Sequence, residues 1–528
     1  MEFIKTNGTS LEVGSETFQF RGFGLGGWFL PEGYMWKMEQ HYDRPRKLEQ
    51  LIIELCGEKY AASFWEFYEN NFITEKDIQW IAKERFNSIR LPLNARHLFS
   101  ENADSYILDQ RRFEKIDQVI EWCRKYHIYV IIDMHAAPGG QTGENIDDSE
   151  NNEPSLFLHD EFVEPLIWLW TEIAKRYKNE DRVAGYDLLN EPLSNRFDYL
   201  QNRVMPVYRK LIASIRSFDD HHLIILEGTH WATDFSIFEE LTPSDIKSFG
   251  PIMLEFHKYW NNPDKESLEK YIKLSKKFNI PLYMGESGEN NCEWYTTLFP
   301  LCDQLKISWS FWTYKKMDCN NSPKSFPKPT EWDKIQNYLQ NKSSPKPSQI
   351  ESIQIFNNFL NNILIDHKNQ NVIRALKREI PILIPCEAYD WHQIKSNRHN
   401  GAILREKDPV TIILSNGKIK QPDYRQMAGE PRPKDEETWV ILSDGDEIGY
   451  NFFSKFSEIL IIVDVRGKGK ISIRLEGNDD NLIFQINNRR KFIKTKFSVY
   501  QNSNYRVILS CILGEVKFHS IELQPIFS

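Results

Sequence analysis

Two glutamates that follow apolar segments are the residues most suited to chemistry. Glu191 comes after the run "GYDLLN", and Glu286 comes after "PLYMG". Hydrolysis of a glycosidic bond needs two carboxyl groups, one protonated to assist the leaving oxygen and one ionised to attack the anomeric carbon. A nearby cation lowers a carboxyl pKa and burial raises it, so we expect Arg90 to keep one glutamate ionised while the other stays protonated.

Other polar and aromatic residues end similar apolar segments. A lone histidine or glutamate in such a place is more often structural than catalytic. Its recurrence at the end of most segments indicates one shared site. The residues are Arg90, His135, Asn190, His257 with Tyr259, and Trp312.

Short apolar segments alternate with helical patterns over the first three hundred residues. Such alternation predicts a parallel sheet that is covered on both faces. Eight repeats are what a closed (β/α)8 barrel (TIM barrel) of the α/β class requires, and its active site lies at the carboxyl ends of the strands. The eight segments are "FRGFGLGG", "NSIRLPL", "YVIIDMH", "VAGYDLLNE", "HLIILEG", "IMLEFHKY", "PLYMGES" and "SWSFWTY".

Helices are predicted between these strands from apolar residues at helical spacing. Examples are residues 111–127, 162–178 and 265–279. Thr74, with Asp77 three residues later, is typical of a helix N-cap.

The pattern changes after the eighth segment. Polar, Pro-rich stretches lead to a closing helix at residues 350–364, and from about Ile380 short β-type segments follow one another between Gly, Asn and Asp turns. We therefore predict a catalytic barrel over residues 1–378 and an all-β sandwich over residues 379–528.

Composition excludes several functional classes. The 528 residues carry a net charge of −9 with both signs interspersed, which argues against a nucleic-acid surface. No apolar run is as long as a membrane span, and the N-terminus lacks the apolar run of a signal peptide. We expect a cytoplasmic protein, or an extracellular one if a leader was removed. Seven scattered cysteines without a CxxC pair favour reduced thiols over disulfides or zinc.

The motifs resemble those of glycoside hydrolase family 5. "LLNEP" resembles the acid/base motif of that family and "YMGESG" its nucleophile strand, while "SIRLPL", "DMHAAPG", "FHKY" and "FWTY" match the other strand ends in order. The similarity spans about residues 20–314. "RGFGLGGWFLPEGY", "FITEKD" and "HAAPGGQTG" are most similar to the exo-β-glucanase branch.

The resemblance implies a retaining mechanism in which Glu191 is the acid/base and Glu286 the nucleophile. The remaining matched positions are implied to bind substrate or to orient the catalytic pair. Asn190 would bind the sugar 2-hydroxyl, Arg90 and Tyr259 would orient Glu286, His135 and His257 would line the site, Trp312 would floor the −1 subsite, and Glu32 would bind the terminal sugar.

Two loops depart from the family pattern, "GESGENNCEW" and the acidic "GGQTGENIDDSENNEPS". Both would border the subsites. For Glu32, Asp147 and Asp148, a solvated loop charge and a functional role are equally compatible with the sequence.

The C-terminal segments "IPCEAYDW" and "LSDGDEIGYNF" are similar to the start of a family 6-type carbohydrate-binding module. That similarity implies that Glu387 could help hold a structural calcium. Tyr389, Trp391 and Tyr450 either bind sugar or fill the sandwich core. Catalysis itself requires no cofactor.

These observations favour an exo-acting retaining β-glycosidase whose partner is a β-glucoside or a β-glucan oligosaccharide. One alternative is an endo-β-1,4-glucanase or mannanase, which needs an open cleft. The other is a non-catalytic carbohydrate-binding protein on the same barrel.

Overall fold

The computed structural model describes residues 2–38, 42–102, 105–340, 344–477 and 481–527. The chain forms two compact units. The first contains Met1–Lys258, Lys270–Gly288 and Lys306–Lys368, and the second contains Tyr259–Glu269, Glu289–Leu305 and Asn369–Ser528. The domain boundary after residue 378 stays a prediction.

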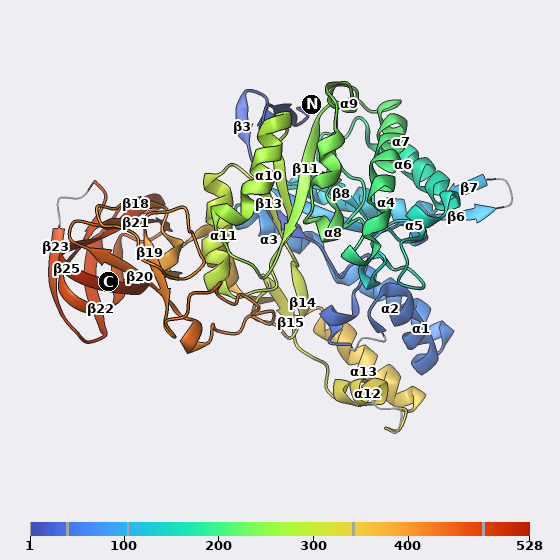
Figure 1. Ribbon diagram of the computed structural model, residues 1–528. Coiled ribbons are helices and arrows are strands. Elements are labelled where there is room, and N and C mark those ends of the chain that lie inside the picture. The colour runs from blue at the N-terminus through green and yellow to red at the C-terminus, as the bar shows by residue number, and fades with distance from the viewer. Residues whose placement is uncertain (1, 39–41, 103–104, 341–343, 478–480, 528) are drawn as a thin grey trace. The chain divides into compact units, whose positions relative to one another are not determined.

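Eight parallel strands close into a barrel in the first unit, as predicted (Figure 1). Each strand pairs with the next in chain order, and the last pairs with the first. Their side chains are almost all buried, which explains why the sequence reads as nearly continuous apolar runs. The strands are β4 (Arg21–Gly24), β5 (Ser88–Asn94), β8 (Tyr129–Ala136), β9 (Val183–Asp187), β10 (Leu223–Glu227), β11 (Ile252–Lys258), β12 (Leu282–Ser287) and β13 (Ser308–Phe311).

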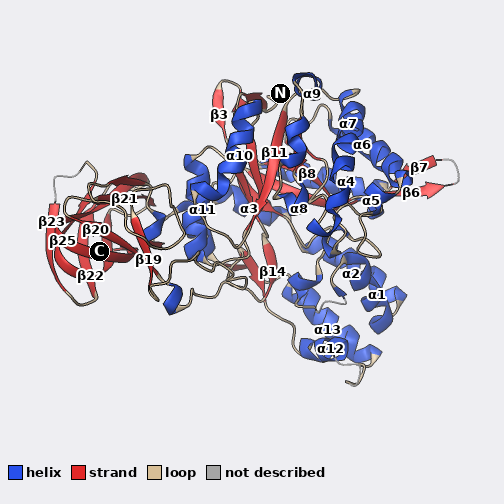
Figure 2. Ribbon diagram, in the orientation of Figure 1, coloured by secondary structure: helices blue, strands red, loops and turns tan. Residues whose placement is uncertain are grey.

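Helices follow the barrel strands along the chain (Figure 2). The predicted cap is confirmed, because Thr74 and Asp77 form a reciprocal capping box at the start of α3. The helices between β4 and β13 are α1 (Pro45–Cys56), α2 (Glu58–Asn71), α3 (Glu75–Lys83), α4 (Gln110–Lys125), α5 (Ser155–Leu158), α6 (Val163–Tyr177), α7 (Val204–Arg216), α8 (Thr229–Ala232), α9 (Pro243–Phe249), α10 (Lys265–Phe278) and α11 (Cys292–Gln304).

A small antiparallel sheet near the N-terminus was not foreseen from the sequence. It consists of β1 (Lys5–Asn7), β2 (Ser10–Val13) and β3 (Glu16–Phe18). Leu11 from this sheet and Ile4 beside it join the apolar cluster inside the barrel, which includes Tyr129, Ile225 and Met253. The sheet therefore adds to the core at the amino ends of the barrel strands.

The first unit has further elements outside the barrel. The predicted closing helix is confirmed as α13 (Gln349–Asn362), which lies beside α1 and α2 (Figure 1). Aromatic rings of Trp36, Phe64 and Phe359 pack against one another here in tilted and edge-to-face arrangements. The other elements are β6 (Phe99–Asn102), β7 (Ser105–Leu108), β14 (Lys315–Met317), β15 (Lys324–Phe326), α12 (Trp332–Gln340) and β16 (His367–Lys368).

The second unit is rich in strands, which confirms the predicted C-terminal β domain (Figure 2). Its strands are linked through the long β25. The segments on either side of Gly467, predicted as two strands, form the single strand β22, because its pairing with β25 only shifts register, between Asp464 and Val465 and between Lys470 and Ile471, and does not break. The elements are α14 (Gln370–Lys377), β17 (Ile382–Pro385), β18 (Trp391–Gln393), β19 (Thr411–Leu414), β20 (Thr438–Ser443), β21 (Glu447–Ser454), β22 (Glu458–Leu475), β23 (Asn481–Asn487), β24 (Lys491–Ser498) and β25 (Ser503–Pro525).

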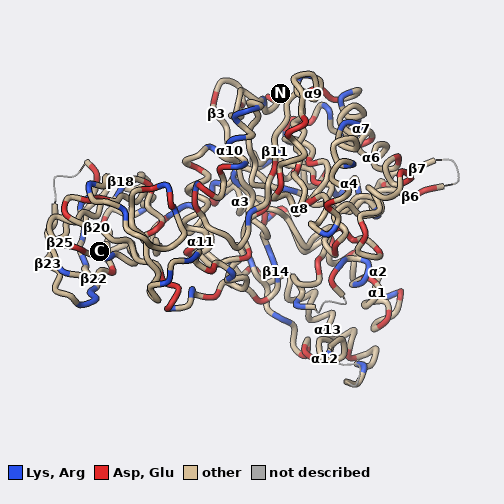
Figure 3. The backbone as a smooth tube through the Cα atoms, in the orientation of Figure 1, with Lys and Arg blue, Asp and Glu red and all other residues tan. Residues whose placement is uncertain are grey.

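Figure 3 shows Lys and Arg intermixed with Asp and Glu over the described parts of the chain. Among the described helices, none is both long enough and apolar enough to cross a membrane.

Candidate active site

Glu191 stands on a turn beyond strand β9, not on the strand itself. The strand ends at Asp187, and Glu191 adopts a left-handed backbone with φ 45°. Such a conformation costs a non-glycine residue roughly 1–2 kcal/mol. Two contacts hold the turn. The Glu191 N–H donates to Glu227 Oε2 at 2.6 Å, and the Thr142 hydroxyl donates to the Glu191 carbonyl at 2.7 Å.

The Glu191 carboxyl is buried against a histidine. His257 Nδ1 on β11 lies 2.6 Å from Glu191 Oε1. Burial raises the pKa of Glu191, and His257 opposes that rise only in part. The environment therefore favours the protonated form that a general acid needs.

Glu286 lies on β12, opposite Glu191. Arg90 Nη1 donates to Glu286 Oε1 at 2.6 Å, and His257 Nδ1 is 3.6 Å from Glu286 Oε2. Carboxylate oxygens of Glu191 and Glu286 and a nitrogen of His257 all lie within 4.8 Å of one another. The two sequence-predicted carboxyl groups therefore meet at one place.

Arg90 is fully buried on β5 and contacts four more carboxylates. The shortest distances from its guanidinium nitrogens are 3.1 Å to Asp133, 2.7 Å to Asp187, 2.9 Å to Glu227 and 3.5 Å to Glu255. We call these four residues the acidic layer. A buried cation with this many partners is held in one orientation by charge-assisted hydrogen bonds.

Sequence reasoning missed the acidic layer, although a signal was present. Asp133 and Glu255 stand two residues before His135 and His257, so each acid points to the same face of its strand as the histidine. In the structure His135 Nδ1 lies 2.8 Å from Asp133, and His257 Nε2 lies 3.3 Å from Glu255. A charged residue inside an otherwise apolar strand, two positions before a polar strand end, was the pattern to notice.

The carboxyl groups of the acidic layer differ in the direction in which their pKa values are shifted. Burial, reinforced by Glu255, raises the pKa of Asp187 well above its usual range. Burial also raises the pKa of Glu255 to about 7. Burial pushes the pKa of Glu227 upward too, but His257 and Arg90 outweigh it and bring that pKa below its usual value. The layer is thus a mixture of acids and carboxylates.

Burial lowers the pKa of both site histidines, but their acidic neighbours outweigh it. Asp133 raises the pKa of His135, and Glu227 and Glu286 raise that of His257 well above its usual range. Glu191, His257 and Glu286, and likewise Glu227, Glu255 and His257, bring together side chains of the types that bind metal ions. Arg90 also contacts Glu286 and the acidic layer and gives them a positive partner.

Asn190 and Trp312 complete the set around the pair. Asn190 Oδ1 accepts from Arg90 at 2.8 Å, and its buried Nδ2 has no hydrogen-bond partner within the described part of the chain. Trp312 stacks on His135 with ring centroids 5.2 Å apart, and its indole N–H donates to the Tyr34 hydroxyl at 3.0 Å. A Cβ on Gly24 would lie 2.6 Å from the Trp312 ring, so the indole needs a glycine there.

The remaining predicted residues lie on loops. Glu32 is buried at the start of a 3-10 helix, Gly33–Trp36, in the loop after β4. Tyr259 directly follows β11, with its ring centroid 5.4 Å from that of Trp260. The substrate-binding roles of Glu32 and Tyr259 stay predictions.

Two aspartates of the acidic loop after β8, Asp147 and Asp148, point into the protein. Asp147 accepts backbone N–H groups of Thr142, Gly143 and Ser149, and Asp148 accepts from Asn94 and Arg96 at 2.9 Å each. Both aspartates are buried, so the interpretation as solvated loop charge is wrong for them. They fix the loop in place.

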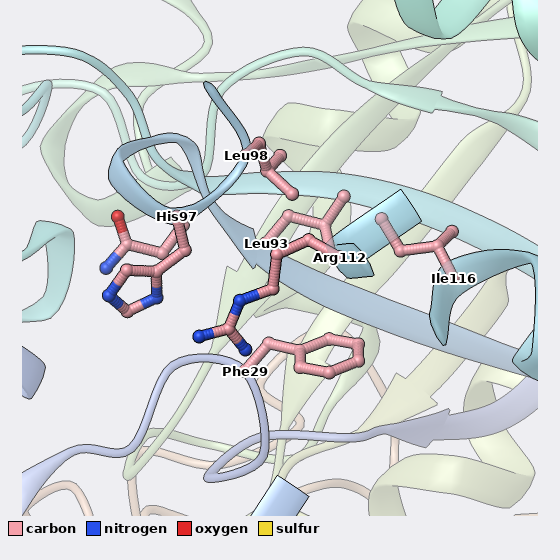
Figure 4. A pocket seen from close by; sticks show the side chains of 7 residues that line it. Phe29, Leu93, His97, Leu98, Arg112 and Ile116 are labelled. Atoms are coloured by element: carbon pink, nitrogen blue, oxygen red, sulfur yellow. The ribbon is translucent and has the colours of Figure 1, made fainter. Parts of the chain in front are cut away.

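A separate small pocket is drawn in Figure 4, where Arg112 and His97 lie near Phe29. Its other lining residues are Leu93, Asn94, Leu98 and Ile116. Its volume of about 10 Å³ suits roughly one water molecule. This pocket is therefore too small for a sugar.

Glu387 in the second unit is buried and pairs with an arginine. Arg432 Nη2 donates to Glu387 Oε1 at 2.8 Å and supplies the charge that neutralises it. Burial alone would raise the pKa of Glu387, but Arg432 brings it below its usual value. The calcium role stays a prediction. Of the other residues discussed there, Tyr389 and Tyr450 are buried and Trp391 is half-buried.

A (β/α)8 barrel with two carboxyl groups facing each other at its mouth defines a class, the glycosidases that work through paired carboxyls. The cellulase model of glycosyl hydrolase family 5 matches residues 55–341, more than half of the chain. The chain belongs to glycoside hydrolase family 5.

Curated relatives share part of the sequence. A β-xylosidase of Phanerodontia chrysosporium is 32% identical over 240 residues, 45% of this chain and 48% of that protein. Endoglucanase C of Acetivibrio thermocellus is 26% identical over 305 residues, 47% of this chain and 86% of that protein. A glucan 1,3-β-glucosidase of Candida oleophila is 28% identical over 237 residues, 42% of this chain and 54% of that protein. The chain thus spans about half the length of two of these relatives.

Proposed function

We propose that this protein hydrolyses β-glucosidic bonds with retention of configuration, using Glu191 as acid/base and Glu286 as nucleophile. The observation that carries the proposal is the approach of their carboxylate oxygens to within 4.8 Å. Retaining enzymes hold the two carboxyls about 5–5.5 Å apart, whereas inverting enzymes need about 6.5–9.5 Å to admit a water molecule.

The surroundings of each glutamate suit its proposed role. Burial raises the pKa of Glu191 and so favours the protonated form, which can donate a proton to the leaving oxygen. Arg90 donates to Glu286 at 2.6 Å and holds its carboxyl group in a fixed orientation for attack on the anomeric carbon. When Glu286 leaves in the second step, Glu191 takes a proton from the attacking water.

Neighbouring residues would position the sugar. The buried Asn190 amide nitrogen, which has no partner among the described residues, can donate to the 2-hydroxyl group. The Trp312 indole, fixed by Tyr34 and His135, offers a flat face under the −1 sugar. Leaving a buried donor unpaired is costly, so a substrate hydroxyl at Asn190 would be bound favourably.

We further propose exo action on β-glucosides or short β-glucans. Hydrogen bonds and ion pairs tie together the loops after β4, β5 and β8. Arg44 donates to the Ser149 carbonyl at 2.6 Å, the Arg46 N–H donates to Asp148 at 2.9 Å, and Arg96 binds both Asp148 and Glu49. Such locked loops suit a closed pocket, and the Candida oleophila relative is a glucan 1,3-β-glucosidase.

An endo-acting glucanase is the second candidate, favoured by the match to 86% of Endoglucanase C. Product analysis on a β-glucan oligosaccharide separates the two. An exo enzyme releases monosaccharide from the first time point. An early ladder of oligosaccharides without monosaccharide would instead establish endo action.

The catalytic assignment is tested with Glu191→Gln and Glu286→Gln on aryl β-glucosides. Each variant should lose about 10³-fold or more in kcat, since both carboxyl groups are needed in every turnover and removing either one disables the pair. Glu172→Gln, which removes an exposed partner of Lys175, is the control and should keep wild-type activity. Retained turnover in either catalytic variant refutes the assignment, and glucan binding without hydrolysis by the wild type would indicate a binding protein.

A further inference from the structure

Glu255 is a buried acidic residue that contacts two basic residues, His257 beside Glu191 and Arg90 beside Glu286. Its Oε1 lies 3.3 Å from His257 Nε2 and 3.5 Å from Arg90 Nε. The opposite nitrogen of His257 contacts Glu191 at 2.6 Å, and another nitrogen of Arg90 contacts Glu286 at 2.6 Å. A continuous chain of contacts therefore joins the two catalytic carboxyls beneath the site.

The neighbouring strand leaves space for this carboxyl group. Gly285 on β12 immediately precedes Glu286, and a Cβ added to it would lie 1.4 Å from Glu255 Oε1. No side chain at position 285 could share that space with Glu255. Burying a carboxyl group costs free energy that an apolar residue of similar size would not cost, so the position is not explained by stability alone.

Groups from its own strand β11 and from five other elements face Glu255. Its electrostatic neighbours are Arg90 on β5, Asp187 on β9, Glu227 on β10, His257 on β11, Tyr283 on β12 and Tyr208 on α7. Burial is the main cause that raises the pKa of Glu255 to about 7, Glu227 adds to it, and Arg90 and His257 oppose it. Its charge can therefore change within the range in which glycosidases work.

We propose that Glu255 is a positioning residue that holds His257 against Glu191 and Arg90 against Glu286, and whose charge acts on Glu191 through His257. The inference rests on the proposed function of these two glutamates. An ionised Glu255 makes proton loss harder for every acid and cation near it. When it is neutral, His257 and Glu191 each release a proton at lower pH.

The test is Glu255→Gln, which keeps the shape of the side chain and removes its charge. The profile of kcat/KM against pH reports the groups of the free enzyme. We expect the alkaline limb of this bell-shaped profile to move to lower pH by about half a unit or more while the acidic limb stays in place, because Glu255 carries its charge only at the higher pH. A folded variant with both limbs at their wild-type positions overturns the inference.

Asp219→Asn is the matched control. Asp219 is also a buried carboxylate of the barrel unit, and it contacts Tyr186 at 2.7 Å and His222 at 2.6 Å, not the catalytic pair. This variant should lose stability but keep the wild-type pH profile. An equal shift in the control would show that the displacement is not specific to Glu255, which also overturns the inference.

Glu255→Asp keeps the test decisive if the glutamine variant does not fold. It keeps the charge but withdraws it from Arg90 and His257, so the maximum of kcat/KM should fall with both limbs near their wild-type pH. An aspartate variant with wild-type kcat/KM contradicts the positioning role. Failure of the proposed function would be recognised separately, as activity retained in Glu191→Gln or Glu286→Gln.

Discussion

Along three barrel strands, the inward-facing side chain changes from apolar to acidic within two residues. Ile131 precedes Asp133 on β8, Ile225 precedes Glu227 on β10, and Met253 precedes Glu255 on β11. The first residue of each pair belongs to the apolar cluster at the amino ends of the strands. The second belongs to the acidic layer around Arg90.

The two layers are built for different purposes. Apolar burial stabilises the fold by about 25 cal/mol for each Å² removed from water. A buried ion cluster contributes little to stability relative to apolar packing of the same volume, but it fixes charged groups in place. The comparison therefore predicts that the amino-end layer controls stability, and that the carboxyl-end layer controls activity as well.

The largest effect is expected at Arg90. Arg90→Met leaves the acidic layer and Glu286 without their shared cation, so the free energy of unfolding should fall by about 3–5 kcal/mol. In the folded fraction, kcat/KM should fall by about 10²-fold or more, since a preorganised charge is lost. Urea denaturation and aryl β-glucoside assays measure the two effects.

Arg216→Met is the matched control for that experiment. Arg216 donates to the carbonyls of Phe249, Asp219 and Pro251 near the amino ends of the strands. Its loss should reduce stability and leave kcat/KM unchanged. If both arginine variants lose activity equally, the division of labour between the two layers is wrong.

An intermediate effect is expected in the apolar layer. Ile225→Ala removes a fully buried side chain and should lower the free energy of unfolding by about 2–5 kcal/mol, through lost burial and the cavity left behind. Activity per folded molecule should match the wild type. A large loss of kcat/KM without a loss of stability would contradict the comparison.

The eight barrel strands and the proximity of Glu191 to Glu286 could be predicted from the sequence, because strand periodicity and strand ends are local patterns. The acidic layer could not be recognised as a cluster, since only barrel closure brings Asp133, Asp187, Glu227 and Glu255 onto one arginine. The turn at Glu191 depends on Glu227, 36 residues away, so strand propensity alone extended β9 too far.

The C-terminal domain shows the same limit. "GKGK" around Gly467 has the composition of a turn, but pairing with β25 along its whole length keeps β22 continuous. The N-terminal sheet was missed because its strands are only three or four residues long. Tertiary pairing decided both cases.

The smallest expected effect is on the pH dependence of the free energy of unfolding, which should have opposite signs in the two layers. At the amino end, burial pushes the pKa of Asp219 upward, but hydrogen bonds from His222 and Tyr186 outweigh it and bring the pKa to about 2. A lowered folded-state pKa means that this stabilisation is complete above the usual aspartate value of about 4. It is lost as the pH falls towards about 2, and it amounts to about 2 kcal/mol.

Glu255 should act in the opposite direction. Its folded-state pKa of about 7 lies above its unfolded value, so the folded protein holds a proton that the unfolded chain releases. Its contribution to stability is complete below the unfolded pKa of about 4.3 and is lost as the pH rises through about 7. Urea titrations at several pH values give the slope of the free energy of unfolding against pH. Asp219→Asn should abolish the slope at low pH, and Glu255→Gln should abolish the slope between about pH 4.3 and 7. A single slope removed by both variants would show that the layers are not electrostatically distinct.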